Sequence, residues 1–302
     1  MAILANSLTR ILVQGITGRE ATTSTYDSLE YGARVVAGVT PGKGGQNIHG
    51  VPIFNSVAQA MLSTAANASL ISVPARFVRS AAFEAFDNRI PLVVIVTERI
   101  PRHDVVAIVE SARLAGTHLI GPNSLGIISP HQTRVGMVGG NVAAIHRAYS
   151  PGSIGVVSRS GGMMTEIANL LTQNGIGQST CISIGGDPII GSTVLDLLPL
   201  YEADPHTKAL VLFCEPGGTM EEQLAERLTT IPSRLPIVAF VAGRFMDKMQ
   251  GRRFGHAGSI VEGIIGSPAS KRAVLQKAGV VIADKLSRIP HLLKNRLDHA
   301  LI

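Results

Sequence analysis

Short runs of β-branched and aliphatic residues alternate with longer amphipathic segments along the first half of this chain. The runs predict strands at 10–14, 34–38, 68–73, 91–96 and 117–120. The segments between them predict helices at 22–31, 56–63, 78–88 and 102–115. Strands that alternate with helices in this way are typical of a parallel sheet covered by helices.

The same alternation restarts after a stretch rich in loop residues, 129–152. The second half predicts strands at 153–158, 179–184, 209–214, 236–241 and 279–282, and helices at 162–174, 191–203, 219–230 and 267–277. We therefore expect an α/β protein with a Rossmann-like domain at 1–130, a linker at 131–150 and a flavodoxin-like domain at 151–302. In such sheets ligands gather at the carboxyl ends of the strands, so the loops that follow the strands are where chemistry is expected.

Composition narrows the class of protein. The 302 residues are 45% hydrophobic, which is enough for a sizeable core, and no run of 18 uncharged apolar residues predicts a membrane span. No signal peptide is visible at the start, and Cys181 and Cys214 both lie in apolar runs that predict buried thiols. We expect a cytoplasmic protein, or one of an organellar matrix if a transit peptide has been removed.

The net charge of +6 favours anionic partners in general. Nucleic acid is not the expected partner, because the basic residues form no stripe and only eight Phe and four Tyr are available for stacking. Small anions remain the better match for this charge.

The first expected strand ends in a glycine loop. Gly15 and Gly18 permit a tight turn, and the helix that follows presents free N–H groups suited to a phosphate. The loop lacks the full dinucleotide fingerprint, because Thr17 stands at its second glycine position and Ala21 at the third small position. A plain turn between strand and helix is the alternative interpretation.

The loop after the second strand, residues 39–45, argues against a nicotinamide dinucleotide. An enzyme that binds NAD usually carries an acidic residue there, whereas this loop carries Lys43 among glycines. Glu98 and Asn123 end later strands of the same half, where they are placed either to orient a nucleotide or to cap the following helices.

Taken in order, seven short motifs resemble the α subunit of succinyl-CoA synthetase from about residue 9 to 279. They are Gly15-Ile16-Thr17-Gly18, the loop 39–45, Gly121-Pro122-Asn123, Ser158-Arg159-Ser160-Gly161, Gly185-Gly186-Asp187-Pro188, Glu215-Pro216-Gly217-Gly218 and Gly255-His256-Ala257-Gly258. The resemblance implies that the first domain binds CoA. The CoA-binding residues then expected are Gly15, Thr17, Gly18, Arg19, Glu20, Lys43, Val73, Pro74, Val96, Thr97, Glu98 and Asn123.

The same resemblance implies that His256 is phosphorylated on its ring and relays phosphate. Flanking glycines would let a loop carry the imidazole to different positions. A phosphoimidazole needs N–H donors, which the helix start at Ser160, Gly161 and Gly162 would supply, and a carboxylate on its other nitrogen, for which Glu215 is the match. Capping of a neighbouring helix is the alternative role of Glu215.

The implied reaction is an acid–CoA ligation in three steps. ATP or GTP, held with Mg²⁺ by an ATP-grasp domain on a partner β subunit, phosphorylates His256. The phosphoryl group then passes to a carboxylic acid, and the CoA thiol displaces phosphate from the acyl phosphate. This chain has no Gly-x4-Gly-Lys-Ser/Thr loop, so we expect it to need that β subunit, in a heterodimer or heterotetramer.

The expected substrate region departs from the family pattern. Succinate-using members usually continue the Ser-Arg-Ser-Gly motif with Thr-Leu-Thr-Tyr, and this chain has Gly162-Met163-Met164-Thr165. Ser124 replaces a cysteine of the family. We therefore expect Ser124, Met163, Met164 and Thr165 near the acid, which is succinate or a related acid such as malate, citrate or sulfoacetate.

Two other functions stay open. A Rossmann-fold NAD(P) oxidoreductase predicts an acidic residue where Lys43 stands. A non-catalytic CoA-binding regulator predicts the loss of His256 or Glu215, and both are present.

Overall fold

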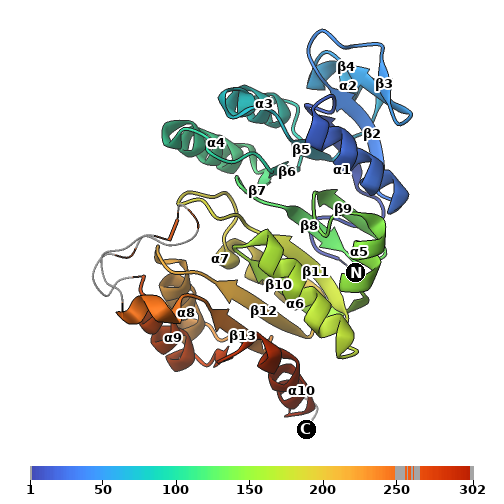
Figure 1. Cartoon of the computed structure of the whole chain (residues 1–302). Helices are drawn as coiled ribbons and strands as arrows, with labels where there is room; N and C mark the ends of the chain where they lie inside the picture. The colour runs from blue at the N-terminus through green and yellow to red at the C-terminus, as the bar shows by residue number, and fades with distance from the viewer. Residues whose placement is uncertain (1, 249–255, 257, 260, 262–265, 300–302) are drawn as a thin grey trace.

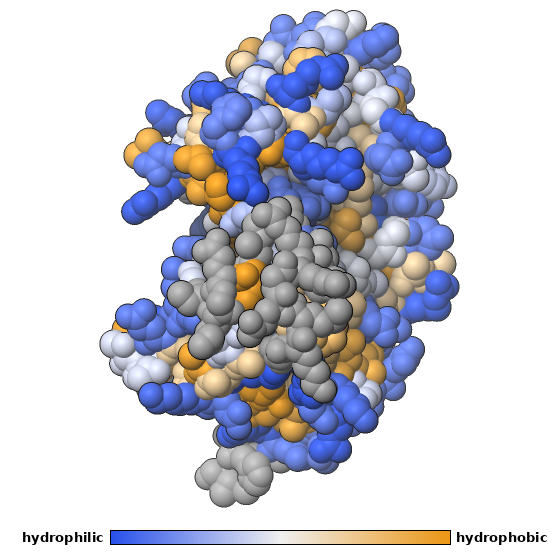
Figure 2. Space-filling view, turned by 60° about the vertical axis from the view of Figure 1, so that its left-hand side comes forward, coloured by the Kyte–Doolittle hydropathy of each residue, from blue (hydrophilic) through white to orange (hydrophobic). Residues whose placement is uncertain are grey.

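The computed structural model describes residues 2–248, 256, 258–259, 261 and 266–299, which form two halves, each built on a seven-stranded sheet (Figure 1). The first sheet and its helices form the upper part of Figure 1, and the second sheet forms the lower part. Hydrophilic residues dominate the outer surface on the face shown in Figure 2. Within the described ranges, no helix is long and apolar enough to cross a membrane.

The first sheet has the Rossmann strand order. Its strands are β1 (Arg10–Gln14), β2 (Arg34–Val39), β3 (Asn47–Ile48), β4 (Val51–Phe54), β5 (Ala68–Ile71), β6 (Leu92–Ile95) and β7 (His118–Ile120), in the order β3-β4-β2-β1-β5-β6-β7. All of them run parallel except β3, which pairs antiparallel with β4. The central strands β5 and β6 are buried throughout, as expected for strands covered on both faces. The predicted Rossmann-like half is confirmed, although the short β3–β4 pair was not foreseen.

Four helices connect these strands. They are α1 (Arg19–Glu30), α2 (Val57–Ser63), α3 (Ala75–Asp87) and α4 (Arg102–Ala115). Local sequence explains their ends: the Ser56 hydroxyl accepts from the Gln59 N–H at the start of α2, and Gly116 ends α4 in the left-handed conformation. Helix α1 begins directly after Gly18, three residues before its predicted start, so the glycine loop leads straight into its first turn.

The second sheet has a flavodoxin-like parallel core. Its strands are β8 (Gly126–Ser129), β9 (Thr133–Gly136), β10 (Pro151–Ser158), β11 (Gln178–Ser183), β12 (Ala209–Cys214), β13 (Ile237–Val241) and β14 (Val281–Ile282), in the order β14-β13-β12-β10-β11-β8-β9. The five parallel strands thus follow the order second, first, third, fourth, fifth, as in flavodoxin-like sheets. The predicted class of the second half is confirmed.

The helices of this half are α5 (Val142–Ala148), α6 (Gly161–Gln173), α7 (Val194–Ala203), α8 (Met220–Thr230), α9 (Pro268–Lys277) and α10 (Ile289–His299), with short 3₁₀ turns at Arg244–Lys248 and Leu286–Arg288. Helix α10, which was not predicted, packs against α6 and the strands β12 and β13. Its apolar residues Ile289 and Leu293 are buried in the core of the second half.

Residues 131–150, which we expected as a linker, hold β9 and α5. The β8–β9 pair extends the second sheet, because β8 pairs antiparallel with β11. Two glycines explain why this stretch looks like a loop in the sequence: a Cβ on Gly126 would overlap the Val135 carbonyl oxygen, and one on Gly136 would overlap that of Leu125. We propose that the second domain begins ahead of β8 rather than at 151.

A buried arginine on β9 ties the two halves together. Arg134 is 1% exposed and donates from Nε to the Ser28 hydroxyl (3.0 Å) and from Nη2 to the Ser24 carbonyl (3.2 Å), both on α1. Its Nη1 donates to the Val138 carbonyl (3.0 Å) and the Gly140 carbonyl (2.6 Å). The helix that follows the first glycine loop is therefore anchored to the second sheet.

We expect Arg134→Met to lower the free energy of unfolding by about 3 kcal/mol, because it leaves several buried acceptors without a donor. Urea unfolding of the full chain measures this. Arg147→Met, at an exposed position on α5, is the matched control and should change little. Equal unfolding midpoints for the two variants would show that Arg134 does not anchor α1.

Candidate functional site

A cavity of about 510 Å³ opens where the strand order of the first sheet reverses, between β1 and β5. Its lining residues come from the loops after β1, β2 and β5 and from α3: Gln14, Gly15, Thr17, Gly18, Val39, Thr40, Pro41, Ser72, Val73, Pro74, Phe77, Ser80, Ala81 and Glu84. Gly15 has φ 83°, and a Cβ there would overlap the Ser72 carbonyl oxygen. Glycine is therefore required at this point of the cavity wall. The position matches the expected ligand crevice of an open α/β sheet.

The structure divides the expected CoA-binding residues into three sets. Gly15, Thr17, Gly18, Val73 and Pro74 line this first cavity. The exposed residues Arg19, Glu20 and Lys43 stand beside it but do not line it. Of the remaining four, Val96 and Thr97 directly follow β6, and Glu98 and Asn123 line a second cavity.

The loop that carries Lys43 is held by a side chain that the sequence did not single out. Asn55 Oδ1 accepts hydrogen bonds from the backbone N–H groups of Gly42 (2.9 Å) and Gly44 (3.0 Å). The hydroxyls of Thr17 and Thr40 lie 3.2 Å apart and join this loop to the first glycine loop. Both loops are therefore fixed around the mouth of the first cavity.

A second cavity of about 350 Å³ lies between the two halves. It is lined by Glu98, Arg99, Ile100, Arg102, Asn123, Asp187, Pro188 and His256. Thr97 donates its hydroxyl to the Val73 carbonyl (2.8 Å), which ties the end of β6 to the end of β5 and so to the first cavity. Glu98 and Asn123 therefore share a cavity with His256, although the sequence placed them only at strand ends.

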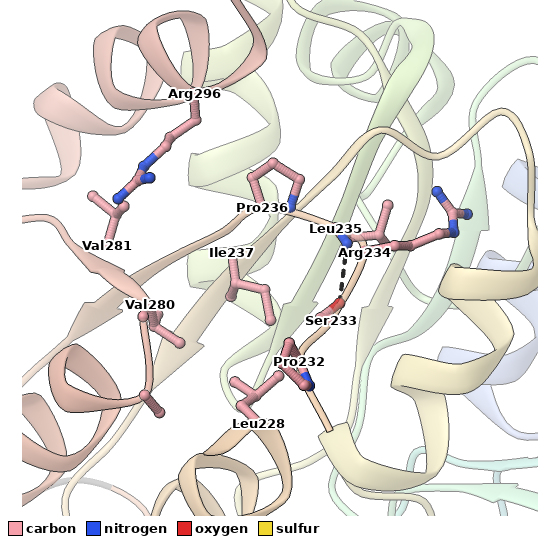
Figure 3. Close-up of a pocket in the computed structure, with 12 residues that line it drawn as sticks. Leu228, Pro232, Ser233, Arg234, Leu235, Pro236, Ile237, Val280, Val281 and Arg296 are labelled. Carbon is pink, nitrogen blue, oxygen red and sulfur yellow. Dashed lines mark hydrogen bonds between the residues drawn. The ribbon is translucent and has the colours of Figure 1, made fainter. Parts of the chain in front are cut away.

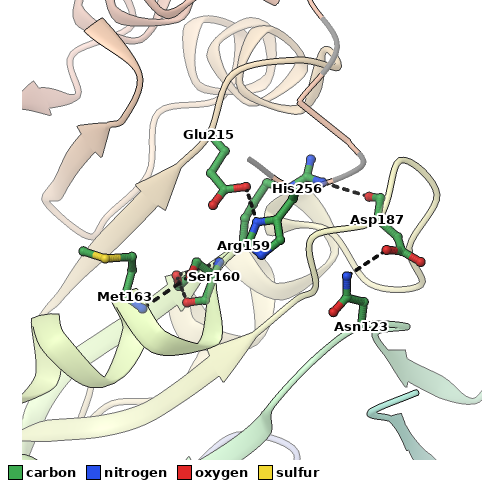
Figure 4. Close-up of polar contacts among 8 residues, drawn as sticks. Asn123, Arg159, Ser160, Met163, Asp187, Glu215 and His256 are labelled. Carbon is green, nitrogen blue, oxygen red and sulfur yellow. Dashed lines mark hydrogen bonds and ion pairs between the residues drawn. The ribbon is translucent and has the colours of Figure 1, made fainter. Parts of the chain in front are cut away.

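Glu215 and His256 meet at the carboxyl end of β12 (Figure 4). Glu215 Oε2 lies 2.7 Å from His256 Nδ1, and Glu215 is buried while the imidazole is 37% exposed. The hydrogen bond to Glu215 raises the pKa of His256, burial works against that rise, and the negative charge of Glu215 adds to it. The carboxylate thus fixes one ring nitrogen and leaves the other free for chemistry.

The loop that contains Gly186 and Asp187 also packs against the imidazole of His256. A Cβ on Gly186 would lie 2.5 Å from His256 Cγ, so glycine is needed where the ring packs. The Gly258 N–H donates to the Gly186 carbonyl (3.1 Å), and Asn123 Nδ2 donates to Asp187 Oδ1 (2.9 Å). Gly255 and Ala257, the other residues of that sequence motif, lie outside the described residues.

Helix α6 begins directly after β10, where the strand order of the second sheet reverses. The Ser160 hydroxyl caps it by accepting from the Met163 N–H (3.4 Å). A Cβ on Gly161 would strike the Leu125 side chain, whereas Gly162 is exposed and has open space around it. The first turn carries no acidic residue, so its free N–H groups form a helix start suited to a phosphoryl group.

The expected substrate region is only partly accessible. Met164 is 0% exposed and belongs to the core of the second half, so its expected place near the acid stays a prediction. Ser124 is also buried, and its hydroxyl donates to the Ser183 carbonyl (2.5 Å). The Thr165 hydroxyl lies 2.9 Å from the hydroxyl of the buried Tyr149. Met163 is partly exposed.

Sequence reasoning missed several residues of the site. Arg99 and Arg102 line the second cavity, and Arg159 lies buried beside His256 (Figure 4). Arg159 was quoted only as part of a motif, although its place directly after β10 was a usable signal. Asp187 likewise belongs to a quoted motif and lines the cavity.

A further cavity of about 380 Å³ lies away from these residues (Figure 3). It is lined by Leu228, Ala278, Arg296 and the segments 232–237 and 279–281, at the end of the sheet where β13 begins. None of the expected site residues lines it. Because ligands of such sheets gather at the opposite, carboxyl ends of the strands, we assign the chemistry to the first two cavities.

Comparison with known proteins agrees with this geometry. Residues 6–99 match the family described as a CoA binding domain, and residues 157–281 match the CoA-ligase family. The ADP-forming succinate–CoA ligase subunit alpha 1 of Archaeoglobus fulgidus is 46% identical over 286 residues, 95% of each chain. An ADP-forming sulfoacetate–CoA ligase subunit of an Acholeplasma species is 38% identical over 294 residues, 97% of this chain and 98% of that one.

Among solved structures, ATP citrate lyase from Methanothrix soehngenii in complex with citrate and coenzyme A has the same fold, with a TM-score of 0.91 at 24% identity. The match covers 99% of this chain and 51% of that one, so our chain spans about half the length of that protein.

This chain belongs to the CoA-ligase family, with a CoA-binding domain ahead of the ligase domain. The resemblance drawn from seven short motifs is confirmed, and so is the enzyme class, a CoA ligase.

We expect the Glu215 hydrogen bond to make the stability of the protein depend on pH. Because the pKa of His256 is raised in the folded chain, the protonated pair stabilises the fold below the unfolded value of about 6.5, and this contribution is lost as the pH rises through the folded value. The difference in unfolding free energy between the wild type and Glu215→Gln should therefore be larger at pH 6 than at pH 9.

Urea unfolding across this pH range, together with an NMR titration of His256, measures the effect. The titration midpoint of His256 should fall when Glu215 is replaced by Gln. An unchanged midpoint would mean that the carboxylate does not control this imidazole.

Proposed function

We propose that the chain is the α subunit of a nucleotide-dependent acid–CoA ligase that works through a phosphorylated His256. One observation supports this most strongly: the cavity that contains the Glu215-bound imidazole is closed by Glu98 and Asn123 at strand ends of the CoA-binding half. A histidine suited to carry phosphate therefore faces the side from which CoA would reach it.

Glu215 determines which nitrogen reacts. Its carboxylate accepts from Nδ1–H, so Nε2 keeps its lone pair and is the nucleophile. Nε2 attacks the terminal phosphorus of the nucleoside triphosphate, the bond from that phosphorus to the bridging oxygen breaks, and the nucleoside diphosphate leaves. Glu215 stabilises the positive charge that the ring gains.

The first turn of α6 then holds the phosphoryl group. The N–H groups after Ser160 point towards the start of the helix, and no side-chain carboxylate in that turn competes with the phosphate oxygens. A carboxylate oxygen of the acid takes the phosphoryl group and frees Nε2. The CoA thiolate next attacks the acyl carbon, a carbon–sulfur bond forms, and inorganic phosphate leaves.

The first cavity supplies the binding site for the nucleotide end of CoA in this proposal. Gly15 keeps its floor open, and the Thr17–Thr40 contact fixes the loops around it. Exposed Lys43 and Arg19 stand beside its mouth, where they are placed for the CoA phosphates. From there the thiol end would pass Thr97 and Glu98 to reach the second cavity.

The nucleotide and Mg²⁺ are proposed to bind a partner β subunit with an ATP-grasp domain, in an αβ or α2β2 assembly. Relatives named as α subunits support a partner chain. Cys181 and Cys214 are free and buried, in keeping with the reducing cytoplasm or organellar matrix that we propose as the location.

We propose a short acid with a second anionic group as the substrate. Arg99 and Arg102 line the cavity of His256 and supply positive charge for a group beyond the reacting carboxylate. Arg99 Nε lies 3.4 Å from Glu98 Oε1, and both side chains of this pair are exposed. Succinate, malate, citrate and sulfoacetate all fit this description. A non-catalytic CoA-binding regulator is the second candidate, but that function gives no role to the hydrogen-bonded pair of Glu215 and His256.

The decisive experiment is mass spectrometry of acid-labile phosphate on the chain co-expressed with its β subunit and given Mg-ATP or Mg-GTP. We expect label on His256 that CoA plus one acid of the panel discharges. His256→Gln should abolish the label, and His118→Gln, an exposed position on β7, should keep it.

The absence of label with a competent β subunit and both nucleotides would exclude the ligase mechanism. The CoA-binding regulator would then be the better interpretation. Label on a residue other than His256 would equally contradict the proposed relay.

The CoA site is tested separately by filling the first cavity. Ser80 is exposed on α3 and lines this cavity, so Ser80→Leu adds bulk inside it without disturbing the core. We expect the CoA dissociation constant measured by calorimetry to rise at least about tenfold, which corresponds to about 1.4 kcal/mol. Ser63→Leu, exposed at the end of α2 and outside the cavity, is the control, and equal affinities would place CoA elsewhere.

A further inference from the structure

Arg159 is a buried cation that has no carboxylate partner among the described residues. It follows β10 directly and is 4% exposed. Its Nη2 donates to the Asp187 backbone carbonyl (2.8 Å), whereas its Nε is buried and has no hydrogen-bond partner in the part of the chain that the structure describes. Within the same part, no acidic side chain lies within ion-pair distance of it.

The two nearby carboxylates are engaged elsewhere. Glu215 binds His256 (2.7 Å), and Asp187 accepts from Asn123 (2.9 Å). A guanidinium stays charged at every accessible pH, and a buried charge without a partner costs several kcal/mol. Within the described part of the chain, Arg159 therefore has no ion-pair partner, which is the state expected of a cation that binds an anionic ligand.

The position of Arg159 relates it to the imidazole rather than to the protein core. A Cβ on Gly258 would lie 2.5 Å from its Nη2, so the guanidinium packs under the loop that carries His256. The positive charge of Arg159 also works against the rise in the pKa of His256. Figure 4 shows Arg159 beside His256, with Ser160 next to it at the start of α6.

We propose that Arg159 is a phosphoryl-binding residue, whose missing counter-ion is the phosphoryl group carried by His256. The planar fork of a guanidinium matches phosphate oxygens, and the charge of Arg159 has no acidic side chain within ion-pair distance among the described residues. Arg159 directly precedes Ser160, whose hydroxyl caps α6, and in this proposal the guanidinium and the N–H groups of the first turn bind the same tetrahedral anion. This inference rests on the proposed function for the origin of the phosphoryl group but not for the anion site itself.

The first test uses inorganic phosphate as the probe. We expect phosphate, compared with chloride at equal ionic strength, to raise the melting temperature of the full chain. Arg159→Gln should lose most of this increase, with apparent phosphate affinity at least about tenfold weaker. Arg113→Gln, exposed near the end of α4, should keep it.

The melting temperature in phosphate-free buffer distinguishes an anion-binding arginine from a purely structural one. If Arg159 only supports the fold, Arg159→Gln melts at a lower temperature than the wild type. If its charge awaits an anion, removing that charge leaves the melting temperature equal or higher. A lower melting temperature together with an undiminished response to phosphate would overturn the proposal.

The second test is the rate of His256 phosphorylation by Mg-ATP in the complex with the β subunit. Loss of one preorganised donor to a developing oxyanion typically slows a reaction about 100-fold or more, and we expect this for Arg159→Gln. Arg159→Lys keeps the charge without the fork and should recover part of the rate. A wild-type rate in Arg159→Gln would refute the role.

These tests separate the two proposals. If wild-type His256 takes no label but phosphate still stabilises the wild type and not Arg159→Gln, the ligase mechanism fails and the anion site stands. If His256 is labelled equally in both proteins and phosphate stabilises both, the anion site fails and the ligase mechanism stands.

Discussion

The hydrogen bond between Glu215 and His256 is the interaction on which the candidate site depends. It joins residues 41 positions apart and orients a partly exposed imidazole, as the proposed nucleophile requires. Other features serve that arrangement: β12 carries the carboxylate to the end of the sheet, and Gly186 leaves room for the ring. Without the pair, the cavity would remain a polar cleft between two domains.

The two sheets matter because their ligand-binding edges face a shared space. The strand order reverses next to β1 in the first sheet and next to β10 in the second, and loops from such points form the crevices of open α/β sheets. Glu98 and Asn123 reach the second cavity from the first half, and Asp187 and His256 reach it from the second. Arg134 anchors α1 to the second sheet, so the relative position of the two halves is fixed by buried hydrogen bonds.

Much of the fold followed from sequence patterns, and the exceptions have clear physical causes. Both parallel cores were predicted because buried strands and amphipathic helices have different periods. The β8–β9 pair was not, because Gly126 and Gly136 are typical of loops unless a neighbouring backbone is known to approach them. The burial of Met164 was also not predicted, because its motif does not show that the helical turn at the start of α6 directs its side chain into the core.

By itself, the sequence determined where glycine turns and polar residues follow strands, because these are local features, and it thereby indicated which loops are candidates for chemistry. It also determined the family, because seven motifs in a fixed order are specific. Only the tertiary structure decided which of those residues meet. The pairing of Glu215 with His256, the contact of the buried Arg159 guanidinium with the Asp187 carbonyl and the cavity shared by both halves arise from contacts between distant segments. Strand order and packing create such contacts, and no local pattern encodes them.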